Sequence, residues 1–329
     1  MVRILSIFSF LFLIVLARKG VGNDLVKFTN QEFREIDTTS NWENKGIFSL
    51  SLAQAALINW AAGGENNFAV NGLVKYFSNY NYDKISWENT INVGYGFMKQ
   101  SNERYRKTDD KLHIASKFGH RINDSLNYTV LLNFDSQMAI GLNENKQKIA
   151  NFLAPAYLVS SLGFDFKPQG AVSVVLAPFT SKFTFVNDQQ LANQGAFGLE
   201  GAVYDDLGVV IKQGRRYRSE FGGYVSINFI QNDFKQEMLN NISVNSKLNL
   251  FTNYLVSPEN LDVNWELLVV MKVNKLLSVN INTYLYYDHD TKVSVDNNKD
   301  GIIDGYGPRT QFKELLGVGF VFDYLSFER

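Results

Sequence analysis

The stretch Leu277-Ser278-Val279-Asn280-Ile281-Asn282-Thr283-Tyr284-Leu285-Tyr286-Tyr287 alternates apolar and polar side chains. Its aliphatic residues fall on one face of an extended chain, and Ser278, Asn280, Asn282 and Tyr284 fall on the other. A period of two is typical of a β-strand with one apolar face and one wetted face. Roughly 9–11 residues of tilted strand cross the hydrocarbon core of a bilayer. The stretch therefore predicts a membrane-crossing strand.

The same alternation recurs along the chain and predicts about twelve strands. They cover residues 46–57, 67–79, 84–99, 108–122, 126–140, 155–167, 171–186, 217–230, 242–256, 262–274, 276–288 and 311–327. Single-chain outer-membrane barrels have an even number of strands. We therefore expect an all-β fold, an antiparallel transmembrane β-barrel of about 12 strands over residues 46–329. A soluble β-sandwich, whose two packed sheets also alternate, is the competing interpretation.

The connections between these segments alternate in length, apart from 231–241, which is long for a periplasmic turn, and 257–260, which is short for an outer loop. Short joints fall at 80–83, 122–125, 167–170 and 274–275, and long polar loops fall at 100–107, 141–154, 187–216 and 289–310. Short periplasmic turns and long outer loops are typical of outer-membrane barrels, and this parity predicts both termini on the periplasmic side. Strand-like residues within 197–212 indicate either a hairpin inside the longest loop or two more barrel strands.

The composition excludes several classes of function. The 329 residues carry a net charge of -1, which gives no overall field toward nucleic acid, so no nucleic-acid partner is expected. The chain has no cysteine, which excludes disulfides, thiolate chemistry and cysteine zinc sites. Aromatic residues make up 14% of the chain, a content that suits the aromatic girdles of a membrane barrel.

The N-terminal residues predict export. Residues 1–22 resemble a secretory signal, with Arg3 before an apolar run over 4–17 and small residues at Gly20 and Gly22. A membrane-anchor helix is the alternative, although the run is short for a span. Residues 23–45 are polar without a clear period and predict an N-terminal periplasmic segment. The expected location is the outer membrane of a Gram-negative bacterium, with the lipid of that membrane around the barrel.

Several short blocks occur in a characteristic order. The most specific is Asn59-Trp60-Ala61-Ala62-Gly63-Gly64, and weaker blocks follow at 106–110, 151–157, 176–180 and 310–314. Together, over residues 45–327, they resemble an uncharacterised family of outer-membrane β-barrel proteins of Bacteroidota. The resemblance implies a barrel and its location, and it implies no activity.

The last predicted strand ends in aromatic residues. Phe320, Phe322 and Tyr324 share its apolar face, and Phe327 closes the segment. A final amphipathic strand of this kind resembles the signal that the bacterial barrel-assembly machinery recognises, so that machinery is an expected partner during biogenesis. Here two charged residues follow Phe327, which departs from a terminal aromatic.

Two motifs lie in predicted outer loops. Trp60, placed at the outer rim with Asn59, Gly63 and Gly64, is either a ligand-stacking residue or an interface anchor beside a glycine turn. Asp296, Asn298, Asp300 and Asp304 stand at positions 1, 3, 5 and 9 of a calcium-loop pattern, with Gly301 at position 6. Position 12 lacks the bidentate glutamate, so a solvated turn is the alternative to a calcium site. No cofactor is required.

Charged residues on the predicted lumen face are the candidate functional residues. They are Glu88, Asp109, Lys111, His113, Lys117, Arg121 and Glu220. Such residues either form a charged conduit that selects solutes or pair with one another and fill a closed barrel. With three histidines and no nucleophile, phosphate-loop or metalloprotease motif, we expect no enzyme. The predicted function is a porin-like channel for small polar solutes, and the alternative is a non-conducting barrel that is structural or binds an unidentified envelope partner. A third hypothesis, a membrane-embedded hydrolase that uses His113, depends mainly on the calcium pattern.

Overall fold

The computed structural model describes residues 41–325 except 56–65, 102–103, 144–145, 169–170, 232–233, 235–238, 240, 275–276 and 296–303. The predicted signal segment 1–22 and most of the predicted periplasmic segment 23–45 lie outside the described residues. The described part belongs to one compact unit, Trp42–Arg329. No helix within it has the length and apolar character needed to span a bilayer.

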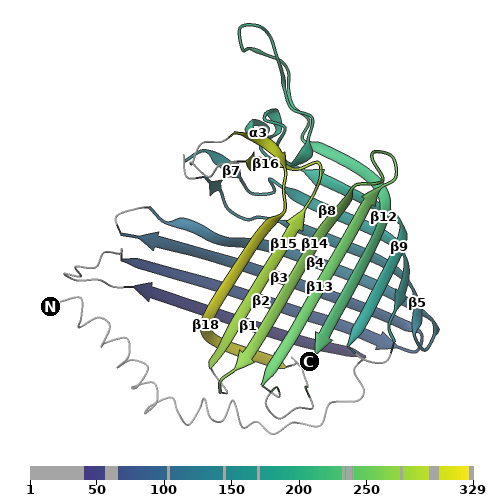
Figure 1. Ribbon diagram of the computed structural model, residues 1–329. Coiled ribbons are helices and arrows are strands. Elements are labelled where there is room, and N and C mark those ends of the chain that lie inside the picture. Colours follow the sequence, from purple (N-terminus) through teal and green to yellow (C-terminus); the bar gives the residue numbers. More distant parts are fainter. Residues whose placement is uncertain are drawn as a thin grey trace, which may run out of the picture. The chain divides into compact units, whose positions relative to one another are not determined.

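Twelve antiparallel strands form a closed barrel, as predicted (Figure 1). They are β1 (Trp42–Ala55), β2 (Asn67–Tyr82), β3 (Ile85–Gln100), β4 (Arg106–Asn123), β5 (Leu126–Ser136), β8 (Ala156–Phe166), β9 (Val172–Phe185), β12 (Tyr217–Gln231), β13 (Ile242–Asn253), β14 (Leu261–Lys272), β15 (Leu277–Tyr287) and β18 (Gln311–Leu325). Each strand pairs with its predecessor and its successor among the twelve, and β18 pairs with β1 to close the ring.

The first strand starts earlier than predicted. β1 begins at Trp42, whose register partner on β2 is Tyr80, and not at residue 46. Residues 42–45, assigned from sequence to the periplasmic segment, therefore belong to the barrel. The polar run Glu43-Asn44-Lys45 interrupts the alternation that a sequence reading relies on, but its backbone still pairs with β2 over this stretch.

The pairing that closes the ring is the shortest of the twelve over the described residues. β1 and β18 run in register from Lys45↔Leu325 to Ser51↔Gly319. By comparison, β2 and β3 pair from Asn67↔Gln100 to Tyr82↔Ile85. The barrel thus has a seam at β1–β18.

The two faces of the sheet differ as the alternation predicts. Large apolar side chains are exposed on the outer face, including Val74, Ile91, Ile114, Val130, Leu132, Leu162, Leu176, Leu316 and Val318. Polar and charged side chains are buried on the inner face, including Asn92, Thr129, Asn133, Ser161, Asp165, Thr180, Lys182, Glu220, Ser226 and Asn280. An apolar exterior around a polar interior is the arrangement of a membrane barrel and the reverse of a soluble domain.

Most connections are short at one end of the barrel and long at the other, although the β12–β13 connection, residues 232–241, is long and lies at the short-turn end. The turns after β2, β4, β8 and β14 are short, and they lie at the same end as the start of β1. The long connections at the other end contain the hairpins β6 (Gly141–Leu142)–β7 (Lys148–Ala150), β10 (Val203–Tyr204)–β11 (Val210–Lys212) and β16 (Lys292–Val295)–β17 (Gly305–Pro308), with the short helices α3 (Gln189–Asn193) and η1 (Ala196–Gly198). The strand-like residues of 197–212 thus form a separate hairpin and add no barrel strand.

Gly163 on β8 lies where the β8–β9 register shifts, between Leu162 and Phe164. A Cβ atom at this position would lie 2.1 Å from the carbonyl oxygen of Leu176 and 2.5 Å from the Cα atom of Ala177. Both neighbours are backbone atoms of β9, so no side-chain rotation can relieve the clash. The close approach of the two strands here requires glycine.

We expect Gly163→Ala to destabilise the barrel by about 1–3 kcal/mol through this overpacking. Gly72→Ala is the matched control, because the nearest atom to a Cβ there is 3.9 Å away, and its effect should stay within about 0.5 kcal/mol. Urea unfolding of the two variants, followed by tryptophan fluorescence, measures the difference. Equal stabilities would contradict the assignment of a tight β8–β9 approach.

Candidate functional site in the barrel lumen

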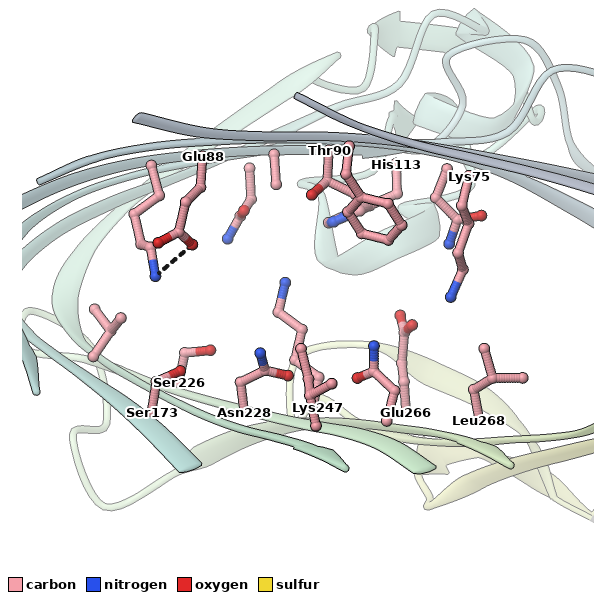
Figure 2. A pocket seen from close by; sticks show the side chains of 18 of the residues that line it. Lys75, Glu88, Thr90, His113, Ser173, Ser226, Asn228, Lys247, Glu266 and Leu268 are labelled. Carbon is pink, nitrogen blue, oxygen red and sulfur yellow. Dashed lines mark ion pairs between the residues drawn. The ribbon is translucent and has the colours of Figure 1, made fainter. Parts of the chain in front are cut away.

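A cavity of about 260 Å³ lies inside the barrel between two walls of strands. Figure 2 shows side chains from both walls pointing toward each other across this space. Lys75, Glu88, Thr90 and His113 come from β2–β4, and Ser173, Ser226, Asn228, Lys247, Glu266 and Leu268 come from β9 and β12–β14. Because most of these groups are polar, the lumen chamber, as we call this cavity, suits water and polar solutes.

One ion pair crosses the lumen at the level of the chamber. The Lys111 ammonium lies 2.5 Å from a Glu266 carboxylate oxygen. Lys111 is on β4 and Glu266 is on β14, and five strands separate β4 from β14 in either direction around the ring. The pair therefore joins opposite walls. The Lys111 ammonium also lies 5.1 Å from the ring centroid of Tyr284, in cation–π geometry.

A second cluster lies toward the short-turn end. Glu88 on β3 binds Lys117 on β4 at 3.0 Å, and it also pairs with Lys167 just after β8. Asp165 on β8 accepts from Lys117 at 2.8 Å and from Lys167 at 3.4 Å. Two cations and two carboxylates thus balance one another at this end of the lumen.

A third cluster lies toward the long-loop end and centres on Lys182 of β9. Its ammonium lies 2.5 Å from Asp262, 3.3 Å from Asp288 and 3.8 Å from Glu220. Arg218 pairs with Glu220 at 2.9 Å and with Asp290 at 3.0 Å. Two cations therefore face four carboxylates, and this end of the lumen is acidic.

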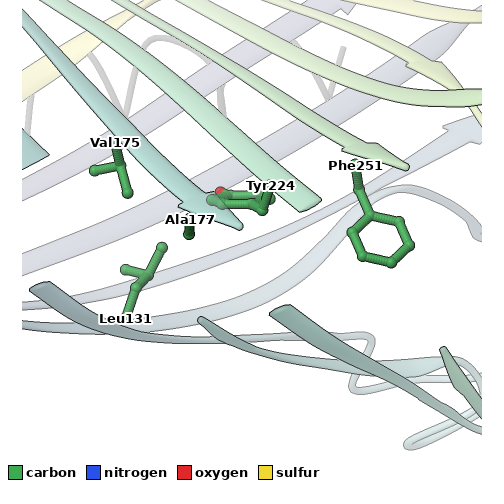
Figure 3. Packing of buried hydrophobic residues seen from close by; sticks show 5 residues of the cluster. All are labelled: Leu131, Val175, Ala177, Tyr224 and Phe251. Carbon is green, nitrogen blue, oxygen red and sulfur yellow. The ribbon is translucent and has the colours of Figure 1, made fainter. Parts of the chain in front are cut away.

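Apolar side chains fill part of the lumen beside these charges. Leu131, Val175, Ala177, Tyr224 and Phe251 form a buried cluster contributed by β5, β9, β12 and β13 (Figure 3). The Tyr224 hydroxyl donates to Asn249 Oδ1 at 2.8 Å, and the Lys182 ammonium lies 5.2 Å from the Phe251 ring centroid. The Tyr224 hydroxyl is therefore hydrogen-bonded although its ring lies in an apolar cluster.

The long loops pack against one another at the end of the barrel opposite the short turns. Ala154, Val186, Leu191, Ala192 and Leu199 form a small buried core, which we call the loop cap. It joins the β5–β8 connection to the β9–β12 connection. A buried apolar core makes these loops one packed unit, not independent segments.

Asp188 fixes the loop cap electrostatically. It is the N-cap of α3 and accepts from the backbone N–H groups of Gln190 and Leu191 at 3.0 and 3.2 Å. Lys148 and Asn151 donate to it at 2.6 and 2.8 Å. Burial raises the pKa of this carboxyl group, but the hydrogen bonds outweigh burial and lower the pKa to about 2.

The structure places most of the predicted lumen residues in ion pairs. Glu88, Lys111, Lys117 and Glu220 belong to the clusters above. Asp109 binds Lys313 at 2.5 Å, and His113 binds Asp135 at 2.7 Å. Arg121 is different, because it is exposed near the end of β4, where the β4–β5 register shifts between Arg121 and Asn123.

Several lumen residues escaped the sequence prediction, among them Lys75, Asp165, Lys182, Lys247, Asp262 and Glu266. Each stands at an inward position of its strand, so the alternation could have placed it on the lumen face. Nothing in the local sequence indicates which opposite charge each would meet, because the partners lie on distant strands.

The two loop motifs lie mainly outside the described residues. This holds for Asn59, Trp60, Gly63 and Gly64, and for Asp296, Asn298 and Asp300 of the calcium pattern. Asp304 is described, and its backbone N–H donates to the Val295 carbonyl at 2.8 Å beside the β16–β17 hairpin. Within the described residues, no group of three or more His, Asp or Glu side chains is arranged to hold a metal ion.

Comparisons with known proteins add a partial family match. Residues 52–142 match the profile of a family described as "Protein of unknown function (DUF3078)". The search of curated proteins gives no match.

Similar solved structures share only the general architecture. An outer membrane channel from Pseudomonas putida F1 has a TM-score of 0.38 and 10% identity, covering 89% of this chain and 98% of that one. The translocator domain of autotransporter NalP from Neisseria meningitidis has a TM-score of 0.33 and 9% identity, covering 93% and 96%. The P. putida toluene transporter TodX has a TM-score of 0.31 and 9% identity, covering 88% and 91%. At these scores the likeness supports no functional conclusion.

Acidification should loosen the loop cap in a defined window. The pKa of Asp188 is lowered on folding, to about 2, whereas an unfolded aspartate titrates near ~3.9. The stabilisation is therefore complete above about pH 4 and is lost as the pH falls toward 2. Pepsin cleavage within residues 186–216 should accelerate over this window. Asp188→Asn should cleave rapidly at every pH in that range, and a wild-type rate equal to that of the variant at pH 4 would contradict the role of the carboxylate.

Proposed function

We propose that this protein is an outer-membrane channel of narrow bore for small polar solutes. The observation that carries the proposal is the lumen chamber, a polar cavity enclosed by an apolar-surfaced barrel and flanked by charged side chains toward both ends. Polar groups along the lumen can hydrogen-bond water and polar solutes, and an apolar outer face can contact lipid.

The distribution of aromatic residues on the outer face supports a membrane location. Trp42, Tyr80 and Trp87 cluster near the short-turn end, with ring centroids 5.1 Å apart for Trp42–Tyr80 and 5.9 Å apart for Trp42–Trp87. Near the long-loop end, Phe97 packs on Tyr105 and Phe221 packs on Tyr254. Exposed aliphatic residues such as Val74, Ile91 and Ile114 lie on the outer face between them. Aromatic girdles that flank an apolar band are characteristic of barrels in a bilayer.

The ion pairs across the lumen argue for a small conductance. Lys111 and Glu266 occupy the space between opposite walls, and Lys182 reaches from β9 to Asp262 on β14. Each pair replaces water in the path of a solute. Such a barrel would pass small solutes slowly and exclude large ones.

Removing the cross-lumen pair tests this proposal. In planar bilayers the folded wild-type protein should show small, steady openings. We expect the double variant Lys111→Ala/Glu266→Ala to conduct several-fold more, because both long side chains leave the lumen and neither charge of the pair is left without its partner. The matched control is Lys212→Ala/Glu200→Ala, which removes an exposed pair on the loops and should leave the conductance unchanged.

A second candidate function is a closed barrel that binds an envelope partner through its loops. The loop cap favours it, because a packed loop surface can serve as a docking face. Folded barrels that stay silent in both the wild type and the double variant would exclude the channel and favour this alternative. Cross-linking in intact cells would then identify what contacts the cap.

Arginine substitutions on the outer face of β4 test the membrane location. Ile114, at the middle of β4, and Ile122, near its end, have similar exposures of 39% and 43%. In a bilayer we expect Ile114→Arg to cost about 2–4 kcal/mol and Ile122→Arg about 0–1 kcal/mol, because the penalty depends on depth. Urea titration of folding into liposomes measures both. Equal costs would argue that no hydrocarbon layer surrounds the barrel.

A further inference from the structure

Two lysines in the lumen chamber have no counter-charge within hydrogen-bonding distance. Lys75 on β2 and Lys247 on β13 extend into the chamber from its two walls (Figure 2). Both are half-buried. Across the whole described part of the chain, neither forms an ion pair or a hydrogen bond. This sets them apart from the other charged side chains that line the chamber, Glu88, His113, Lys117 and Glu266, all of which are paired.

Lys247 lacks a partner because its neighbour is engaged elsewhere. Its register partner on β14 is Glu266, the adjacent side chain on the same face of the sheet. Opposite charges at such positions ordinarily pair. Glu266 instead crosses the lumen to Lys111, at 2.5 Å. The Lys247 ammonium is left facing the cavity.

Lys75 has no acid beside it on either neighbouring strand. Its register neighbours are Ile47 on β1 and Asn92 on β3. One acid further along that row, Asp135 on β5, is held by His113 at 2.7 Å. Lys75 therefore also directs its charge into the cavity.

The groups around the chamber leave a net positive charge. Lys75, Lys111, Lys117 and Lys247 supply four cations, and Glu88, Asp135 and Glu266 supply three carboxylates, so these groups sum to +1. The same cavity is lined by Ser173, Ser226, Asn228 and Asn245, whose hydroxyl and amide groups can donate hydrogen bonds. At about 260 Å³, it is smaller than the pockets of roughly 300–1,000 Å³ that hold drug-sized ligands.

We propose that the chamber is a binding site for a small dicarboxylate, held between Lys75 and Lys247. An ammonium from each wall matches a ligand with a carboxylate at each end, and charge-assisted hydrogen bonds of this type are the strong ones. The inference rests on the proposed channel function for the route by which the anion enters. It assigns that channel an anionic solute, although the acidic long-loop end alone would indicate a cation.

Calorimetric titration of the folded full-length protein in detergent with succinate tests the site. Succinate should bind, and succinamide, its neutral analogue, should not. Lys75→Met and Lys247→Met should each weaken succinate binding about tenfold or more, since a hydrogen bond to a charged group contributes roughly 1.5–3 kcal/mol. Lys84→Met, which removes an exposed lysine from the β2–β3 turn, should bind like the wild type.

Two further variants keep the test decisive if a methionine variant does not fold. Lys247→Arg retains the charge and should retain binding. Glu266→Gln releases Lys111, raises the positive charge of the chamber and should tighten binding severalfold. The temperature-dependent gel mobility of folded barrels verifies folding in each case.

The outcomes separate this inference from the channel proposal. The site would be overturned if the folded wild-type protein does not bind succinate. It would also be overturned if the folded Lys75→Met and Lys247→Met variants both bind succinate as tightly as the wild type. Both results hold whether or not the barrel conducts. Succinate binding to a barrel that is silent in bilayers would support the site and overturn the channel.

Discussion

Every backbone N–H and C=O in an apolar medium needs a hydrogen-bond partner, and in this protein the closure of β1 onto β18 supplies the last set. An open sheet of the same strands would leave one edge of donors and acceptors at each side. Closure forces alternate residues inward around the whole ring. The segregation of apolar residues outside and polar residues inside, and with it the lumen, follows from that single constraint.

The inner face then has its own electrostatic requirement. Charges enclosed by a low-dielectric wall are costly unless they are paired, and a barrel of this size brings opposite walls within reach of long side chains. Lys111 pairs with Glu266 across the lumen, and Lys182 pairs with three acids. Pairing across the lumen also redistributes charge, because an acid that reaches across cannot serve its neighbour. The positive chamber and the acidic loop end result from which partners are chosen, and not from the numbers of acids and bases in the chain.

The sequence predicts the strands well and the lumen only in part. The alternation of Leu277–Tyr287 and its counterparts depends on local geometry, since successive residues on a strand face opposite sides. All twelve predicted segments correspond to barrel strands, and the hairpin within 197–212 was one of two stated alternatives. The start of β1 was missed because Glu43, Asn44 and Lys45 break the pattern while their backbone still pairs. Lumen partners were beyond prediction: Lys111 and Glu266 are 155 positions apart, and only the stagger and closure of the ring bring them together.

The short seam between β1 and β18 has a mechanical consequence. Two strands are harder to separate the longer they pair, because each paired residue adds backbone hydrogen bonds. Among the described residues, the paired length is least between β1 and β18. Under lateral tension the ring would part between β1 and β18 before it parted anywhere else. The barrel wall would then have a slot between β1 and β18. The pairing of the first and last barrel strands is thus the position at which the barrel would open first.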